Sequence, residues 1–259
     1  MLASGALTFA FEKATIEGKL TIGTLVLVSL VSWTVIFSKT RQLWRARTIA
    51  KKFFAAYRAT RDPLELYRRK EAFDGAPAYE VYFNAAEEVE YHLKNSPVKV
   101  KGVVKISPTS FDTVRITLER TVGAEALDLE KGMIVLSTAV AGGPFIGLLG
   151  TVWGVMETFS GIARAASASL TAMAPGVAGA LIATVTGLLV AIPAMFAYNF
   201  MVTSIRAITQ ELDNYASEYA TQIEHKYVDT RPLSEELAEA LYAVEQRKFM
   251  SEEIKAEVA

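Results

Sequence analysis

Long apolar windows alternate along this chain with charged segments of helical pattern. Three windows, 20–38, 132–156 and 165–205, contain no Asp, Glu, Lys or Arg. The first has 19 residues, enough as a helix to cover roughly 28 Å and cross the hydrocarbon of a bilayer. The third is too long for one crossing, and its first part, "AASASLTAMAP", is small and polar. We therefore expect a loop there and a third span that begins near Pro175 or Gly176.

The charged segments also have helical periodicity. In "RARTIAKKFFAAYRAT" and "YEVYFNAAEEVEYHLKN" apolar residues return at intervals of three or four, whereas "FDGAPA" and "NSPVKVKGVVKISP" have the composition of loops. Ser110 is a candidate N-cap for a helix that runs into the second span, and "TSIRAITQELDNYASEYATQIEHK" continues the third. The pattern predicts an all-α membrane protein with three transmembrane helices, in which spans two and three extend into long cytoplasmic helices.

The distribution of basic residues predicts the orientation. Eighteen Lys and Arg lie in 39–131, six in 206–259, and three on the other side of the proposed spans; the dense run after residue 38 is the main argument, because basic residues flanking a span stay inside. The expected order is a periplasmic amphipathic segment 1–19, span 20–38, a cytoplasmic helical domain 39–131, span 132–158, a periplasmic loop 159–175, span 176–204 and a cytoplasmic tail 205–259.

The amino-acid composition argues against several classes of function. Half the chain is hydrophobic (51%) and 21% is charged, with a net charge of −1, so nothing favours nucleic-acid binding. No cysteine is present, and the two histidines lie in charged helical surroundings, so we expect no metal site and no cofactor. The acidic run 87–90 is interpreted as a solvated helix face, and no phosphate-binding or nucleophile motif occurs. We therefore expect no enzyme.

Small residues recur at four-residue steps in spans two and three, which allows membrane helices to approach closely. They indicate a helix-packing and oligomer interface. The candidates are Gly143, Gly147, Gly150, Gly154, Gly179 and Gly187.

Hydroxyls in the same spans are a second signal. Thr151 and Thr158 are seven residues apart and share a helix face, while Thr184 and Thr186 lie in span three. Each hydroxyl could bond a carbonyl of its own helix, or the group could form a polar lining for water or protons.

The two span motifs carry a family resemblance. "GPFIGLLGTVWGVMETFSGIA" and "MAPGVAGALIATVTGLLVAIPAMFAYN", together with "SWTVIFSK" at the end of the first span, resemble the ExbB/TolQ proteins of the MotA/TolQ/ExbB proton channel family. The resemblance implies an inner-membrane subunit of a Gram-negative bacterium that uses the proton motive force. It also implies a homopentamer in membrane lipid, a single-span ExbD/TolR-like partner with a membrane aspartate, and a TonB- or TolA-like protein that delivers the work to the envelope.

Residue by residue, the family's pore threonines correspond to Thr151 in "GTVWG" and Thr184 in "LIAT". The sequence departs from the family at Gly179, in "APGVAGAL", where members usually carry a pore glutamate. It has Glu157 instead, near the outer end of span two, facing either the channel mouth or the interface. A non-motor oligomeric scaffold of an envelope complex remains the alternative function, and Gly179 is its best support.

Overall fold

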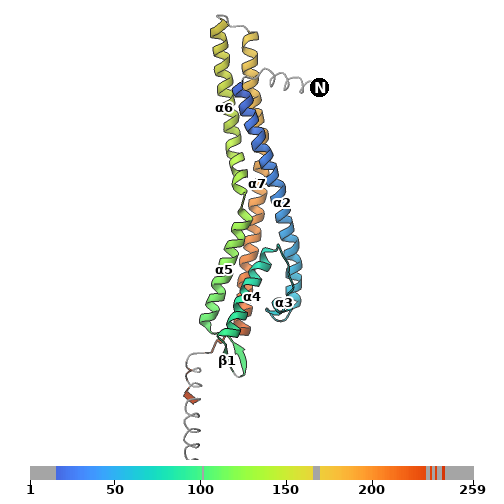
Figure 1. The fold of residues 1–259 in the computed structure, drawn as a ribbon, viewed down its shortest axis with the longest axis vertical. Coiled ribbons are helices and arrows are strands. Elements are labelled where there is room, and N and C mark those ends of the chain that lie inside the picture. Colours follow the sequence, from blue (N-terminus) through green and yellow to red (C-terminus); the bar gives the residue numbers. More distant parts are fainter. Residues whose placement is uncertain are drawn as a thin grey trace, which may run out of the picture. The chain divides into compact units, whose positions relative to one another are not determined.

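The protein is described by a computed structural model covering residues 16–100, 102–165 and 170–231, with Ser234, Leu237, Leu241 and Tyr242 (Figure 1). The expected amphipathic segment lies mostly outside the described residues, as does most of the tail beyond 231. The described elements, in chain order, are α2 (Ile16–Ala59), α3 (Glu65–Arg69), α4 (Pro77–Asn95), β1 (Val98–Val100), β2 (Val103–Lys105), α5 (Pro108–Glu130), α6 (Met133–Ala165) and α7 (Leu170–Tyr227).

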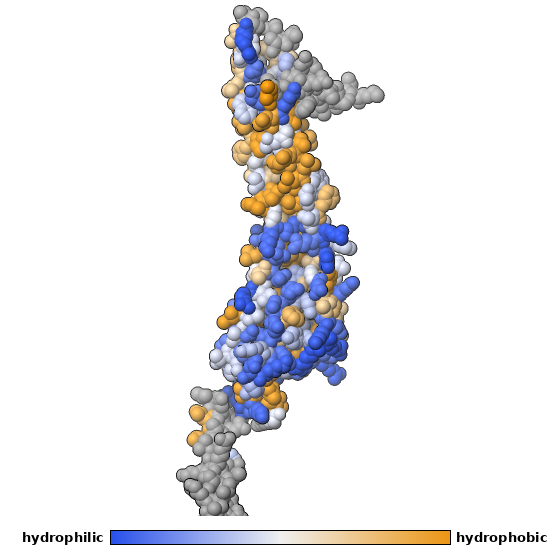
Figure 2. Space-filling model, in the orientation of Figure 1, coloured by the Kyte–Doolittle hydropathy of each residue, from blue (hydrophilic) through white to orange (hydrophobic). Residues whose placement is uncertain are grey.

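The all-α membrane fold is confirmed. Three helices, α2, α6 and α7, are long and apolar enough to cross a membrane, and α7 continues without a break over 58 residues. The chain forms two compact units. Unit 1 comprises Met1–Phe54, Phe73–Tyr79 and Val122–Leu212, and unit 2 comprises Ala55–Ala72, Glu80–Thr121 and Asp213–Ala259. Hydrophobic residues cover much of the spanning part of unit 1 (Figure 2).

The loop expected before span three is largely helical. Helix α6 continues to Ala165 and α7 begins at Leu170, so Pro175 lies inside a helix. Leucine, methionine and alanine are good helix formers, and the helix continues through Pro175 at the loss of one backbone hydrogen bond. Helical structure therefore extends beyond the predicted span limits on this side.

The segment interpreted as a loop after α4 contains a β-hairpin. Strands β1 and β2 pair antiparallel, with Val98 opposite Lys105 and Val100 opposite Val103. The loop prediction was wrong because each strand has only three residues, too few for a period-two pattern to outweigh the flanking proline and glycine. Gly102, at a φ of +83°, occupies the turn, where a positive φ favours glycine.

Helix α5 begins earlier than expected. The Ser107 hydroxyl accepts a hydrogen bond of 3.1 Å from the Ser110 N–H, so Ser107 is the N-cap and Ser110 is not; Pro108 takes the first helical position, where no N–H is needed. The helix ends at Glu130, and Gly132, at a φ of +81°, separates it from α6. The extension of span two is thus a separate helix rather than a continuation.

Tyrosines form much of the core of unit 2. The rings of Tyr57 and Tyr215 lie 5.5 Å apart, and those of Tyr82 and Tyr219 lie 5.4 Å apart. Such edge-to-face pairs add to the hydrophobic stabilisation from ring burial. The parallel bridge between Ile106 and Val228 fixes the end of α7 against the segment that follows the hairpin.

Candidate functional site

Helices α6 and α7 approach each other at backbone distance inside unit 1, where they run side by side (Figure 1). A Cβ atom placed on Gly187 would lie 2.6 Å from the carbonyl oxygen of Gly143. One on Gly154 would lie 2.7 Å from the carbonyl oxygen of Gly176 and 2.8 Å from the Cβ of Ala180. No side chain fits at these distances, so glycine is required for this packing.

The same contact continues through the middle of the helix pair. A Cβ on Gly147 would lie 3.0 Å from the Ala183 carbonyl oxygen, and one on Gly150 would meet the Ala183 methyl group and the hydroxyl of Thr21 from α2. Gly179 is buried as well. Five of the six predicted packing glycines therefore lie in close contacts between helices of one chain. Their role in packing and in an oligomer interface stays a prediction.

Three of the four candidate pore threonines are tied to their own helix. Thr151 donates to the Leu148 carbonyl at 2.6 Å, Thr158 to Gly154 at 2.8 Å and Thr186 to Ile182 at 2.7 Å. Thr158 is also buried against Gly176. These three hydroxyls agree with the first interpretation given above, in which a threonine hydroxyl donates a hydrogen bond to a carbonyl of its own helix.

Thr184 differs from the other three. It is partly exposed, and within the described residues its hydroxyl has no hydrogen-bond partner. Its Cα lies opposite Gly147, 3.1 Å from the position of a Cβ there, which places it at the edge of the α6–α7 contact. Thr186 follows two residues later and so projects about 200° around the helix from Thr184. The two therefore cannot line the same face.

Glu157 has a partner near the end of α6. Its carboxylate lies 2.8 Å from the Arg164 guanidinium, and both side chains are exposed. The pair places opposite charges together where the apolar window ends, which gives Glu157 a local electrostatic role.

Comparison with known proteins decides the family. Residues 86–214 match the model of the MotA/TolQ/ExbB proton channel family. The Tol-Pal system protein TolQ of Haemophilus influenzae is 34% identical over 213 residues, 82% of this chain and 90% of that protein. The chain belongs to the MotA/TolQ/ExbB family. The biopolymer transport protein ExbB of Salmonella typhimurium is 32% identical over 214 residues, covering 80% of this chain and 82% of that protein.

One basic residue of this MotA/TolQ/ExbB member was not singled out from the sequence. Lys39, at the end of "SWTVIFSK", is buried, and its ammonium group donates to the carbonyls of Asp128 and Leu129 at 3.3 and 3.1 Å, and to Gln42 at 2.8 Å. Burial lowers its pKa, against the opposing charge of Asp128. A cation at the last carbonyls of a helix is favourable, so Lys39 fixes α2 to the end of α5.

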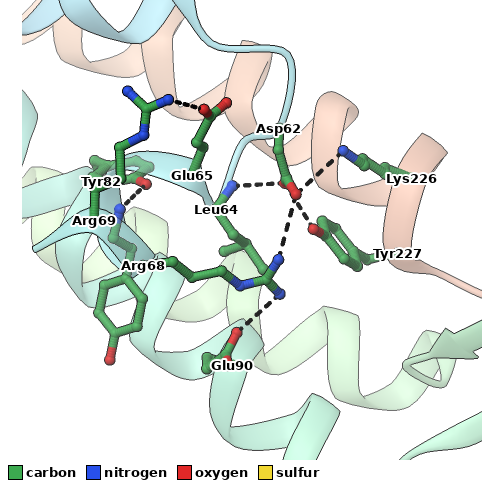
Figure 3. A network of polar contacts seen from close by, with 10 residues as sticks. Asp62, Leu64, Glu65, Arg68, Arg69, Tyr82, Glu90, Lys226 and Tyr227 are labelled. Carbon is green, nitrogen blue, oxygen red and sulfur yellow. Dashed lines mark hydrogen bonds and ion pairs between the residues drawn. The ribbon is translucent and has the colours of Figure 1, made fainter.

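A second missed group organises unit 2 (Figure 3). The Asp62 carboxylate accepts hydrogen bonds from the Leu64 N–H at 3.0 Å and the Tyr227 hydroxyl at 2.7 Å, and lies 3.4 Å from both Lys226 and Arg68. Burial alone would raise the pKa of this carboxyl, but the hydrogen bonds and the charge of Lys226 hold it below its ordinary value. The sequence signal was the Asp-Pro turn, in which aspartate commonly bonds the N–H two residues ahead.

Proposed function

We propose that this chain is the channel-forming subunit of a proton-driven motor in the bacterial inner membrane. In this proposal several copies, five as the family resemblance implies, enclose a single-span ExbD/TolR-like partner that supplies a membrane aspartate. Proton flow past that aspartate drives work that a TonB- or TolA-like protein delivers to the envelope.

The proposal rests on two observations. The central parts of spans two and three have no charged side chain, and among the four candidate threonines the hydroxyl of Thr184 has no hydrogen-bond partner within the described residues. Between Lys131 and Glu157, and between Arg164 and Arg206, the sequence has no Asp, Glu, His, Lys or Arg. A proton pathway needs a group that binds and releases protons, so the titrating side chain must come from another chain. Thr184 supports this interpretation, because its hydroxyl is available to form a hydrogen bond with a titrating side chain of the partner.

Thr151 has a secondary part in the proposal. It lies one helical turn beyond Gly147, and Gly147 faces Thr184. Its hydroxyl oxygen already donates its proton to Leu148 but keeps lone pairs that can accept a hydrogen bond from water or a protonated carboxyl. Thr158 and Thr186 are assigned to helix packing and helix bonding.

The test compares Thr184→Val with Thr186→Val. Valine keeps the shape of threonine and removes the hydroxyl, and the Thr186 hydroxyl is already engaged with Ile182. We expect Thr184→Val to lower proton-motive-force-dependent envelope work about tenfold, corresponding to roughly 1.4 kcal/mol, and Thr186→Val to leave it within about twofold.

Equal effects of the two substitutions would contradict the role of Thr184. Treatment with a protonophore distinguishes the motor hypothesis from the non-motor scaffold hypothesis. Function that survives collapse of the proton gradient in the wild-type chain would reject the motor and favour the scaffold.

A further inference from the structure

The α2 helix carries a row of positive charge where its apolar part ends. From Gly18 to Arg61 the sequence contains no acidic residue, and Arg41, Arg45, Arg47, Lys51 and Lys52 follow one another within twelve positions. All five side chains are exposed, and none takes part in an ion pair within the described residues. Lys39 is the exception in this stretch, because it is buried and its ammonium group is already bonded.

Aromatic side chains lie on the same face as the first two arginines. Trp44 is 72% exposed and Phe37 is 69% exposed. Together with Arg41 and Arg45 they line a depression of about 640 Å³ that also includes Ile36 and Thr40. The positions 37, 41, 44 and 45 repeat at helical spacing, so one face of α2 presents rings and guanidinium groups together.

The position of Arg41 and Arg45 along α2 places this face at the level of the lipid headgroups. The apolar stretch ends at Ser38, so at 1.5 Å per residue Arg41 lies about 4.5 Å and Arg45 about 10 Å further along the helix axis. The headgroup layer on each side of a bilayer is about 5–8 Å thick. Arg41 lies within it. The side chain of Arg45 is long enough to reach it by a change of rotamer from its place in the structure, where its Nε lies 3.5 Å from the position of a Cβ on Gly75, whereas Lys51 and Lys52 lie about 20 Å away.

We infer that this face of α2 binds the phosphate headgroup of an anionic phospholipid. Arg41 and Arg45 bind the phosphate oxygens, Phe37 packs at the boundary between the headgroup and the acyl chains, and Trp44, about 9 Å beyond Ser38 along the helix axis, packs at the water side of the headgroup layer. Arginine suits phosphate because its planar fork donates two parallel hydrogen bonds, and tryptophan favours this depth of the membrane. The inference does not depend on which side of the membrane residue 39 faces.

The test measures lipid retained by the full-length protein in non-ionic detergent by native mass spectrometry. The added lipids are phosphatidylglycerol and, for comparison, uncharged phosphatidylcholine. We expect the wild-type chain to prefer phosphatidylglycerol and the Arg41→Gln/Arg45→Gln variant to bind it about thirtyfold more weakly, at about five- to sixfold for each lost charge.

The matched control is Lys51→Gln/Lys52→Gln, which removes the same charge from the same helix beyond the headgroup layer. It should keep phosphatidylglycerol binding within about threefold, because charge attraction weakens over a Debye length. An equal loss in both variants would overturn the site, as would equal retention of both lipids by the wild-type chain.

Two further outcomes would assign the face to another occupant and overturn the proposal. The first is displacement of phosphatidylglycerol by inorganic phosphate, which would indicate a site for the free ion. The second is unchanged lipid binding by the Arg41→Gln/Arg45→Gln variant together with loss of its oligomers, which would indicate a contact with a second copy of the chain.

Discussion

Single side chains decide which polar groups of this protein are already engaged and which are available. Thr151, Thr158 and Thr186 bond carbonyls of their own helices, whereas Thr184 makes no such bond in the part of the chain that the structure describes. The spacing of these threonines was visible in the sequence. Their partners were not, because a threonine hydroxyl chooses between its own helix and other groups according to the packing around it.

Asp62 provides a prediction for pH. Its carboxyl has a pKa below the ordinary value, so the folded state binds this proton more weakly than the unfolded state does. The stabilisation is complete above the unfolded pKa of about 3.9 and is lost as the pH falls through the folded pKa. We expect Asp62→Asn to lower the free energy of unfolding by about 1–3 kcal/mol at neutral pH, and the difference from wild type to shrink below about pH 4.

Chemical denaturation of the detergent-solubilised chain at several pH values measures this difference. Glu65→Gln is the control. Glu65 and Arg69 form an ion pair at the surface of helix α3, and such surface pairs contribute less than about 1 kcal/mol to the free energy of unfolding. A difference between wild type and Asp62→Asn that stayed constant from pH 7 to pH 3 would refute the assignment.

Whole helices were easier to predict than the short elements between them. Uncharged windows located the spans of α2, α6 and α7, and the helical repeat of apolar positions located α4 and the charged continuation of α2. Strands β1 and β2 have three residues each, which is too short for a period-two pattern to stand out. The break at Gly132 was hidden because the glycine lies inside an uncharged window, where it is equally compatible with a packing position.

The contact between α6 and α7 gives a prediction at this scale. Gly154→Ala would place a methyl group 2.7 Å from the Gly176 carbonyl oxygen, and overpacking of this kind costs about 1–3 kcal/mol. Gly142→Ala is the control on the same helix, because nothing lies within 4 Å of its Cβ, and alanine favours a helix over glycine.

Thermal unfolding in non-ionic detergent should show a clear fall in midpoint for Gly154→Ala and an unchanged or slightly raised midpoint for Gly142→Ala. Equal midpoints for the two variants would show that α6 and α7 do not meet at Gly154.

For the molecule as a whole, the sequence predicted three spans and the structure provides three helices that can form them. The orientation rests on the distribution of basic residues alone. The chain has no cysteine, so single cysteines can report it without background. Lys94 and Ser160 are both exposed and lie in segments expected on opposite sides of the membrane.

In spheroplasts, a membrane-impermeant maleimide should label Ser160→Cys and should reach Lys94→Cys only after the membrane is opened. The reverse pattern would invert the topology. Labelling of both variants in closed spheroplasts would contradict the intervening span. Full labelling of both after solubilisation confirms that each cysteine is reactive.

The backbone contact between Gly143 and Gly187 also has a mechanical consequence. If α7 slid along α6 by one residue, about 1.5 Å, the helix would need to turn by about 100° to keep the same face inward. Without that turn, side chains would move into the space that only glycine leaves open. Gradual sliding of α7 along α6 is therefore blocked. We expect the two helices to tilt or rotate in the membrane together, as one rigid body.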